Sequence, residues 1–96
     1  MKIQILDFAE QDIIEGFHFY EKQSPGLGQY FLDSIFTDIE SLHLYFGTHP
    51  QYFGYYRLLA QRFPFAIYYL IKDEIIQIYA ILDCRKNPIK TIKRLN

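Results

Sequence analysis

The sequence predicts an α+β domain in which an antiparallel helical hairpin packs on one face of a twisted, mainly antiparallel four-stranded sheet. Two early segments place apolar residues at helical spacing, and the later segments are rich in β-branched and aromatic residues. The expected order is β-α-α-β-β-β, followed by a short C-terminal helix or arm. With 96 residues the chain suffices for one core, so we expect a single domain over residues 1–96.

The first strand and the first helix are predicted before residue 24. Ile3–Leu6 alternates apolar and polar residues as a short strand does. Asp7, followed three residues later by Glu10, has the form of a capping box and predicts a helix from Phe8. The apolar face of this helix has helical spacing and comprises Ala9, Ile13, Phe17 and Tyr20.

A second helix is predicted from Ser24-Pro25, where serine suits the N-cap and proline the first helical position. Gly47 and Pro50 mark its end. The short connection to the first helix favours an antiparallel hairpin, since neither apolar face can stay exposed. The apolar face of the second helix comprises Leu27, Phe31, Ile35, Ile39 and Leu42.

Three strands are expected to complete the body of the domain. Gln51–Leu59 is rich in Tyr and Phe, although Gly54 indicates a bulge or bend. Phe63–Ile71 and Ile75–Leu82 are strand-like, and the polar residues between them predict a hairpin turn. In the tail, Pro88–Asn96, apolar residues recur every three positions, which predicts a short helix or an ordered arm with its lysines facing water.

The net charge of -1 conceals a division between the two halves of the chain. Residues 1–50 carry two cations and eight acids, whereas residues 51–96 carry eight cations and three acids. From Arg85 to the end there are five cations and no acid. This pattern favours a basic face for an anionic partner. Acids on exposed helix faces and bases at strand ends would be the simpler alternative.

Composition excludes several classes of protein. Half of the residues are apolar and 19% are aromatic, which is typical of a globular chain and not of a disordered one. No apolar run approaches the roughly 20 residues that cross a bilayer, and no signal-peptide pattern is present, so we expect a cytoplasmic protein without a membrane partner. The single cysteine, Cys84, agrees with a reducing compartment. The histidines lack metal-ligand spacing, and neither a metal nor a cofactor is expected.

One ordered set of segments covers nearly the whole chain: Tyr20-Glu21, Ser24–Gly28, the helix to Leu42, Pro50, Tyr52–Arg57, Arg62–Phe65, Ile67–Tyr69, Ala80–Leu82 and Arg85–Pro88. Taken in this order, the segments resemble the RelE/ParE superfamily of bacterial type II toxins, also called plasmid stabilisation proteins. The resemblance implies a compact, growth-inhibiting toxin held inactive by a small antitoxin encoded beside it, which wraps the toxin with a helix or an added strand. Family targets are of two classes: mRNA in the ribosomal A site, cut by the RelE-like branch, and DNA gyrase, inhibited by the ParE-like branch.

The residues favour the ParE-like branch and a binding role over an enzymatic one. A ribonuclease needs cations for the scissile phosphate and a group that activates the 2′-hydroxyl. Residues 86–96 contain neither the tyrosine nor the histidine common in the RelE-like branch. Asp83 stands just before the basic pair, where many relatives have histidine; it would repel phosphate and could pair with Arg85. The sequence pI of about 6.3 is also low for a ribosome-directed protein.

The sequence therefore predicts a ParE-like toxin that binds a target such as DNA gyrase and is neutralised by a cognate antitoxin. The alternatives are a ribosome-dependent mRNA endoribonuclease and a non-toxic relative that retains antitoxin binding. No residue is assigned a catalytic role; for a ribonuclease the candidates are Arg57, Arg62, Arg85 and Lys86. The predicted target- or partner-binding residues are Arg57, Arg62, Asp83, Arg85, Lys86, Lys90, Lys93 and Arg94.

Overall fold

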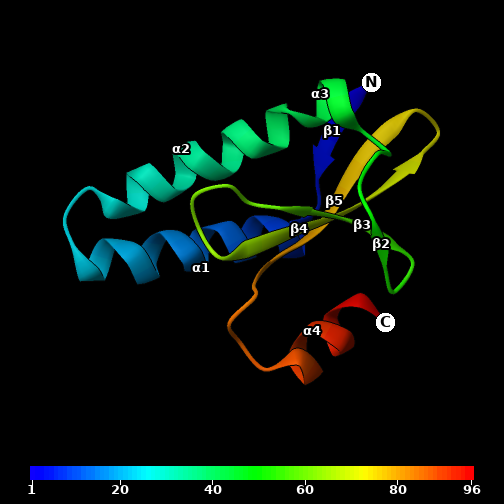
Figure 1. Cartoon of the computed structure of the whole chain (residues 1–96). Helices are drawn as coiled ribbons and strands as arrows, with labels where there is room; N and C mark the ends of the chain where they lie inside the picture. Colours follow the sequence, from blue (N-terminus) through cyan, green and yellow to red (C-terminus); the bar gives the residue numbers. More distant parts are fainter.

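One five-stranded sheet organises the fold of the computed structural model, which describes all residues 1–96 (Figure 1). The strands lie in the order β1-β5-β4-β3-β2; β1 runs parallel to β5, and every other neighbouring pair is antiparallel. The predicted α+β class and mainly antiparallel sheet are thus confirmed. The elements are β1 (Lys2–Ile5), α1 (Asp7–Gln23), α2 (Leu27–Glu40), α3 (Leu42–Tyr45), β2 (Gln51–Tyr52), β3 (Tyr55–Leu59), β4 (Phe65–Lys72), β5 (Ile75–Asp83) and α4 (Pro88–Leu95).

The strand predicted over residues 51–59 is in fact the hairpin β2–β3, so the sheet has five strands and not four. Phe53 and Gly54 both have positive φ, 52° and 83°, as the central residues of a type I′ turn do. This backbone reverses the chain and pairs Tyr52 with Tyr55. Gly54 correctly indicated that the strand is interrupted, but the interruption is a complete chain reversal and not a bulge.

The connection between α1 and α2 differs from the predicted cap. Ser24 follows the last residue of α1, and α2 begins at Leu27 after Gly26, whose φ of 89° suits glycine. The Glu21 carboxylate accepts hydrogen bonds from the backbone N–H groups of Gly26 and Gly28, the latter at 2.9 Å. A side chain from the end of α1 therefore accepts the hydrogen bonds of free backbone N–H groups at the start of α2, which is the role predicted for Ser24.

The start of α1 also differs from the predicted capping box. Leu6 is the N-cap residue and makes no side-chain cap hydrogen bond, whereas Asp7 is already helical. Asp7 and Glu10 lie in the first turn, where acidic side chains interact favourably with the helix dipole. The predicted helix is present, but its start is stabilised by the charges of acidic side chains and not by a capping hydrogen bond.

The two faces of the sheet are covered by different helices. The hairpin α1–α2 packs on one face, over a core that includes Phe31, Ile35, Ile67 and Tyr69 (Figure 1). The opposite face packs Ala66, Tyr68 and Ala80 against Leu95 of α4. The tail is therefore a helix, as one of the two predicted forms, and it has its own small core. None of the helices combines the length and apolarity required to cross a membrane.

An irregularity in β5 determines which side chains face α1. Tyr68 pairs with Ala80 and Tyr69 with Ile78, which leaves Tyr79 as an extra residue in β5. A bulge of this kind reverses the alternation of side chains beyond it. Ile81 and Asp83 consequently lie on the face covered by α1, where the Asp83 charge acts on the Tyr20 hydroxyl of that helix.

Candidate partner-binding site at the basic C-terminal end

Asp83, near the end of β5, holds the side chain of Arg85. Its carboxylate accepts hydrogen bonds from the Arg85 backbone N–H at 2.8 Å, from Nε at 3.0 Å and from Nη2 at 2.8 Å. The same Nη2 donates to the Tyr20 hydroxyl of α1 at 3.3 Å. Arg85 therefore forms a bidentate ion pair with Asp83, and this geometry fixes the orientation of the guanidinium at the protein surface.

The electrostatics of this pair follow from its hydrogen bonds. The Arg85 guanidinium lowers the pKa of Asp83 below its ordinary value, although burial opposes the shift. Asp83 in turn raises the pKa of Arg85. The Asp83 side chain is 8% exposed and that of Arg85 is 56% exposed, so the cation remains accessible while its charge is largely compensated. Asp83 thus pairs with Arg85, as the sequence suggested.

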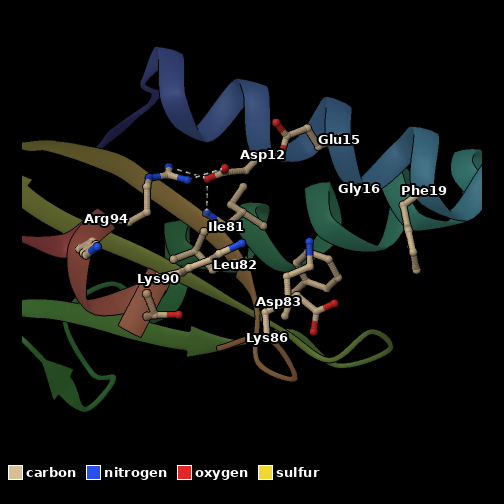
Figure 2. Close-up of a pocket in the computed structure, with 13 residues that line it drawn as sticks. Asp12, Glu15, Gly16, Phe19, Ile81, Leu82, Asp83, Lys86, Lys90 and Arg94 are labelled. Carbon is tan, nitrogen blue, oxygen red and sulfur yellow. Dashed lines mark hydrogen bonds and ion pairs between the residues drawn. The ribbon is translucent and has the colours of Figure 1, made fainter. Parts of the chain in front are cut away.

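Asp12 forms a second buried ionic contact, which joins α1, β5 and α4. Its carboxylate accepts the backbone N–H of Ile81 at 3.0 Å and both Nη groups of Arg94 at 2.8 and 2.9 Å (Figure 2). β1 pairs with β5 only as far as Ile78, so the Ile81 N–H at this edge of the sheet has no acceptor in β1. The Asp12 carboxylate accepts it instead. The hydrogen bonds that Arg94 donates to the Asp12 carboxylate raise the pKa of Arg94.

The sequence reasoning did not single out Asp12. The helical spacing could have identified Asp12 as a buried residue, because it lies three residues after Ala9 and four before Gly16, on the buried stripe of α1. A carboxylate at such a position requires a partner, because burial of an unpaired charge is costly. The identity of that partner, Arg94, depends on the docking of α4.

A cleft of about 460 Å³ lies between α1, the end of β5 and α4 (Figure 2). Five of the predicted partner-binding residues line it: Asp83, Lys86, Lys90, Lys93 and Arg94. Of these cations only Arg94 forms an ion pair. Across the cleft, α1 contributes Asp12, Glu15, Gly16 and Phe19, and the sheet contributes Phe65, Ile81 and Leu82. We refer to this feature as the charged cleft.

Arg57 lies on the other face of the sheet, apart from the charged cleft. Its guanidinium carbon is 4.6 Å from the centroid of the Tyr52 ring, a cation–π distance. A small hollow of about 120 Å³ brings Arg57 and Lys86 together with Tyr52 and Tyr68. Burial raises the pKa of the Tyr68 hydroxyl, and the neighbouring Arg57 opposes that shift.

Arg62 is the predicted site residue that the structure separates from the others. It lies in the loop between β3 and β4 and lines neither the charged cleft nor the hollow around Arg57. Its charge acts on Asp38 of α2: burial raises the pKa of that carboxyl above its ordinary value, and the hydrogen bond from the Gln61 N–H and the Arg62 charge oppose the rise. The four ribonuclease candidates are therefore not assembled in one place.

Comparisons with known proteins identify the fold. No protein-family model matches the sequence, and no curated protein matches it. Among solved structures, the fold is similar to that of a chain described as "Chromosomal ParDE TA system from P. aeruginosa", where TA denotes toxin–antitoxin. The TM-score is 0.76 at 20% sequence identity, over 84% of this chain and 92% of that chain. This likeness confirms the predicted ParE-like α+β fold.

Proposed function

We propose that this protein is the toxin of a type II toxin–antitoxin pair and that a cognate antitoxin is its partner. The observation that carries the proposal is the structural likeness to a ParDE chain, which extends over 84% of this chain and 92% of that chain. The ordered sequence motifs that resemble the same superfamily support it independently. In this role the protein acts in the bacterial cytoplasm, as a plasmid-stabilisation or chromosomal growth inhibitor.

We further propose that it inhibits growth by binding a target such as DNA gyrase. The state of Arg85 supports a binding mode, because Asp83 compensates its charge and accepts hydrogen bonds from two of its guanidinium N–H groups. A ribonuclease would require such a cation to be available to a phosphate in the transition state. Three cations that make no ion pair, Lys86, Lys90 and Lys93, lie instead in the lining of the charged cleft.

Ribosome-dependent cleavage of mRNA is a second candidate, favoured by one observation. Arg57 and Lys86 share a hollow with Tyr52 and Tyr68, so cations and aromatic rings occur together. Cations can hold a phosphate and tyrosines can stack on bases. Under this alternative, mRNA cuts would disappear in Arg57→Ala and Lys86→Ala, whereas Lys72→Ala, on the exposed end of β4, would leave them unchanged.

Inducible expression tests the proposed function. We expect bacterial growth to stop when the gene is induced alone and to resume when the adjacent reading frame is expressed with it. An early-stop version of the same gene is the control for the burden of expression. Arrested cells are then assayed for gyrase supercoiling activity and for mRNA cleavage, which separates the two modes of action. Abundant folded protein without arrest would refute toxicity and favour a non-toxic relative.

A further inference from the structure

We propose that the charged cleft binds a segment of the partner protein that combines several acidic side chains with at least one apolar side chain. This inference rests on the proposed function, because the partner is taken to be the cognate antitoxin. It goes further by assigning the docking place and the chemistry of the segment.

The unpaired charge in the cleft is positive. Asp12 and Asp83 are compensated by Arg94 and Arg85. Among the remaining charged residues of the lining, the side chains of Lys86, Lys90 and Lys93 make no hydrogen bond or ion pair, and Glu15 is the single acid whose side chain makes none. Three free cations against one free acid favour an anionic occupant.

The floor and one wall of the cleft are apolar. Ile81 and Leu82 of β5 lie in the lining together with Phe65. Phe19 extends from α1 at the edge of the cleft and is 50% exposed, so its ring adds accessible apolar surface to the lining (Figure 2). Ile81 and Phe65 are already buried, whereas Phe19 is exposed and Leu82 is partly exposed. An occupant bearing only charge would leave the surface of Phe19 and Leu82 in water, and an apolar side chain placed among the lysines would cover it.

The spacing of the lysines favours a polypeptide segment over a single small anion. Lys90 and Lys93 are three residues apart on α4 and so lie on one face, separated by about one helical turn, or roughly 5 Å. Lys86 precedes the helix and extends the row. A cleft of about 460 Å³ also exceeds what one phosphate would fill. Successive carboxylates on a partner segment match this row.

The contacts that hold α4 keep the lysine row in place. Asn87 caps the helix by accepting the N–H of Ile89 at 2.9 Å, and Leu95 is buried against the sheet. At the far end, Arg94 is held by Asp12 at 2.8 Å. Because both ends of α4 are anchored, the lysines are presented without the cost of ordering the helix on binding.

The test measures the affinity of the purified protein for the product of the adjacent reading frame and for overlapping synthetic peptides that cover it. The double charge reversal Lys90→Glu/Lys93→Glu is compared with Lys22→Glu/Lys72→Glu, which makes the same change of charge at exposed positions outside the cleft. We expect the first variant to bind about 10- to 100-fold more weakly, with a smaller salt dependence, and the second to bind like wild type. Phe19→Ala should bind about tenfold more weakly.

Each outcome decides between the proposals. If circular dichroism shows that the charge reversal disturbs folding, Lys90→Gln/Lys93→Gln removes the charges without introducing acids. Equal binding by all folded variants would refute the cleft as the docking place and leave the toxin proposal intact. If wild type forms no complex with the adjacent product, both proposals fail. Wild-type self-association that the cleft variants abolish would assign the cleft to a second copy and overturn the inference.

Discussion

Single side chains join different elements of this small fold by hydrogen bonds, and Glu21 is the clearest case. It lies at the end of α1, yet its carboxylate accepts the backbone N–H groups at the start of α2. Gly28 must also remain glycine there, since a Cβ would lie 2.8 Å from the Phe17 carbonyl oxygen. The tight contact between the helices is what brings the Glu21 carboxylate within reach of both amides.

Replacement of Glu21 by alanine should therefore weaken the helical hairpin. The variant loses a charged acceptor for two helix-start amides, and we expect a cost of about 1–2 kcal/mol in the free energy of unfolding. Urea unfolding followed by circular dichroism measures it. Glu10→Ala is the matched control, because Glu10 is an exposed helical acid without a hydrogen-bond partner and should cost only a few tenths of a kcal/mol. Equal costs for the two variants would show that the cap is unimportant.

The Asp83–Arg85 pair should make stability dependent on pH in the acid range. The pKa of Asp83 is lower in the folded protein than its ordinary value, so the pair stabilises the fold above the unfolded-state pKa of about 3.9. This contribution is lost as the pH falls through the folded-state value. Asp83→Asn should therefore show a shallower decline in stability below about pH 4 than wild type. The contribution would be contradicted if the free energy of unfolding, measured with urea, fell equally steeply below about pH 4 for wild type and Asp83→Asn.

At the level of elements, α4 is attached to the body by few contacts, of which the Asp12–Arg94 pair is central. Arg94 is 33% exposed on its side chain, whereas Asp12 is 7% exposed. Removal of either partner breaks the ion pair, but removal of Asp12 also leaves the Ile81 N–H without its acceptor. The two residues are therefore not equivalent, although they share the same hydrogen bonds.

We expect both Asp12→Ala and Arg94→Ala to destabilise the fold, for different reasons. Asp12→Ala leaves the Ile81 N–H without its acceptor, and Arg94→Ala leaves the buried Asp12 carboxylate without its counter-charge, so each should lower the free energy of unfolding by about 2–3 kcal/mol. The double variant should cost less than the sum, and this double-mutant cycle gives the coupling energy of the pair. Glu15→Ala, one turn along α1, is the control and should be near neutral. Additive costs would show that the two side chains act independently.

The predicted elements differ in accuracy for identifiable physical reasons. The helices α1 and α2 were predictable because Ile13, Phe31, Ile35 and Ile39 are buried on the stripes that their spacing defines. The hairpin β4–β5 was predictable because its turn consists of polar residues between two apolar strands. The hairpin β2–β3 was missed because Phe53, an aromatic residue, occupies a left-handed conformation that its strand-like neighbours conceal.

Across the whole molecule, the division of charge along the chain is partly compensated in space. The acidic first half forms the helical hairpin and the basic end forms α4, and the two meet across the charged cleft (Figure 2). Arg85 and Arg94 each pair with an acid, one at the end of β5 and one on α1. The basic face expected from the sequence is therefore reduced to the lysines that remain unpaired.

The tertiary structure also separated residues that the sequence grouped as one site. Arg57 lies on the α4 face of the sheet with Tyr68, whereas Arg62 lies beside Asp38 at the end of α2. The arginines are five residues apart in sequence, but β3 ends between them and the chain turns toward the helices. Proximity along the chain thus failed to predict proximity in the fold.

The sequence by itself determined the α+β class, the helical hairpin, the hairpin β4–β5 and the basic C-terminal segment, because periodicity and turn chemistry are local properties. Only the tertiary structure decided the parallel pairing of β1 with β5, the bulge at Tyr79 and the contact of Asp12 with Arg94. These features depend on residues far apart in the chain, whose contacts form only when the sheet and helices pack together. The charged cleft is a product of that packing.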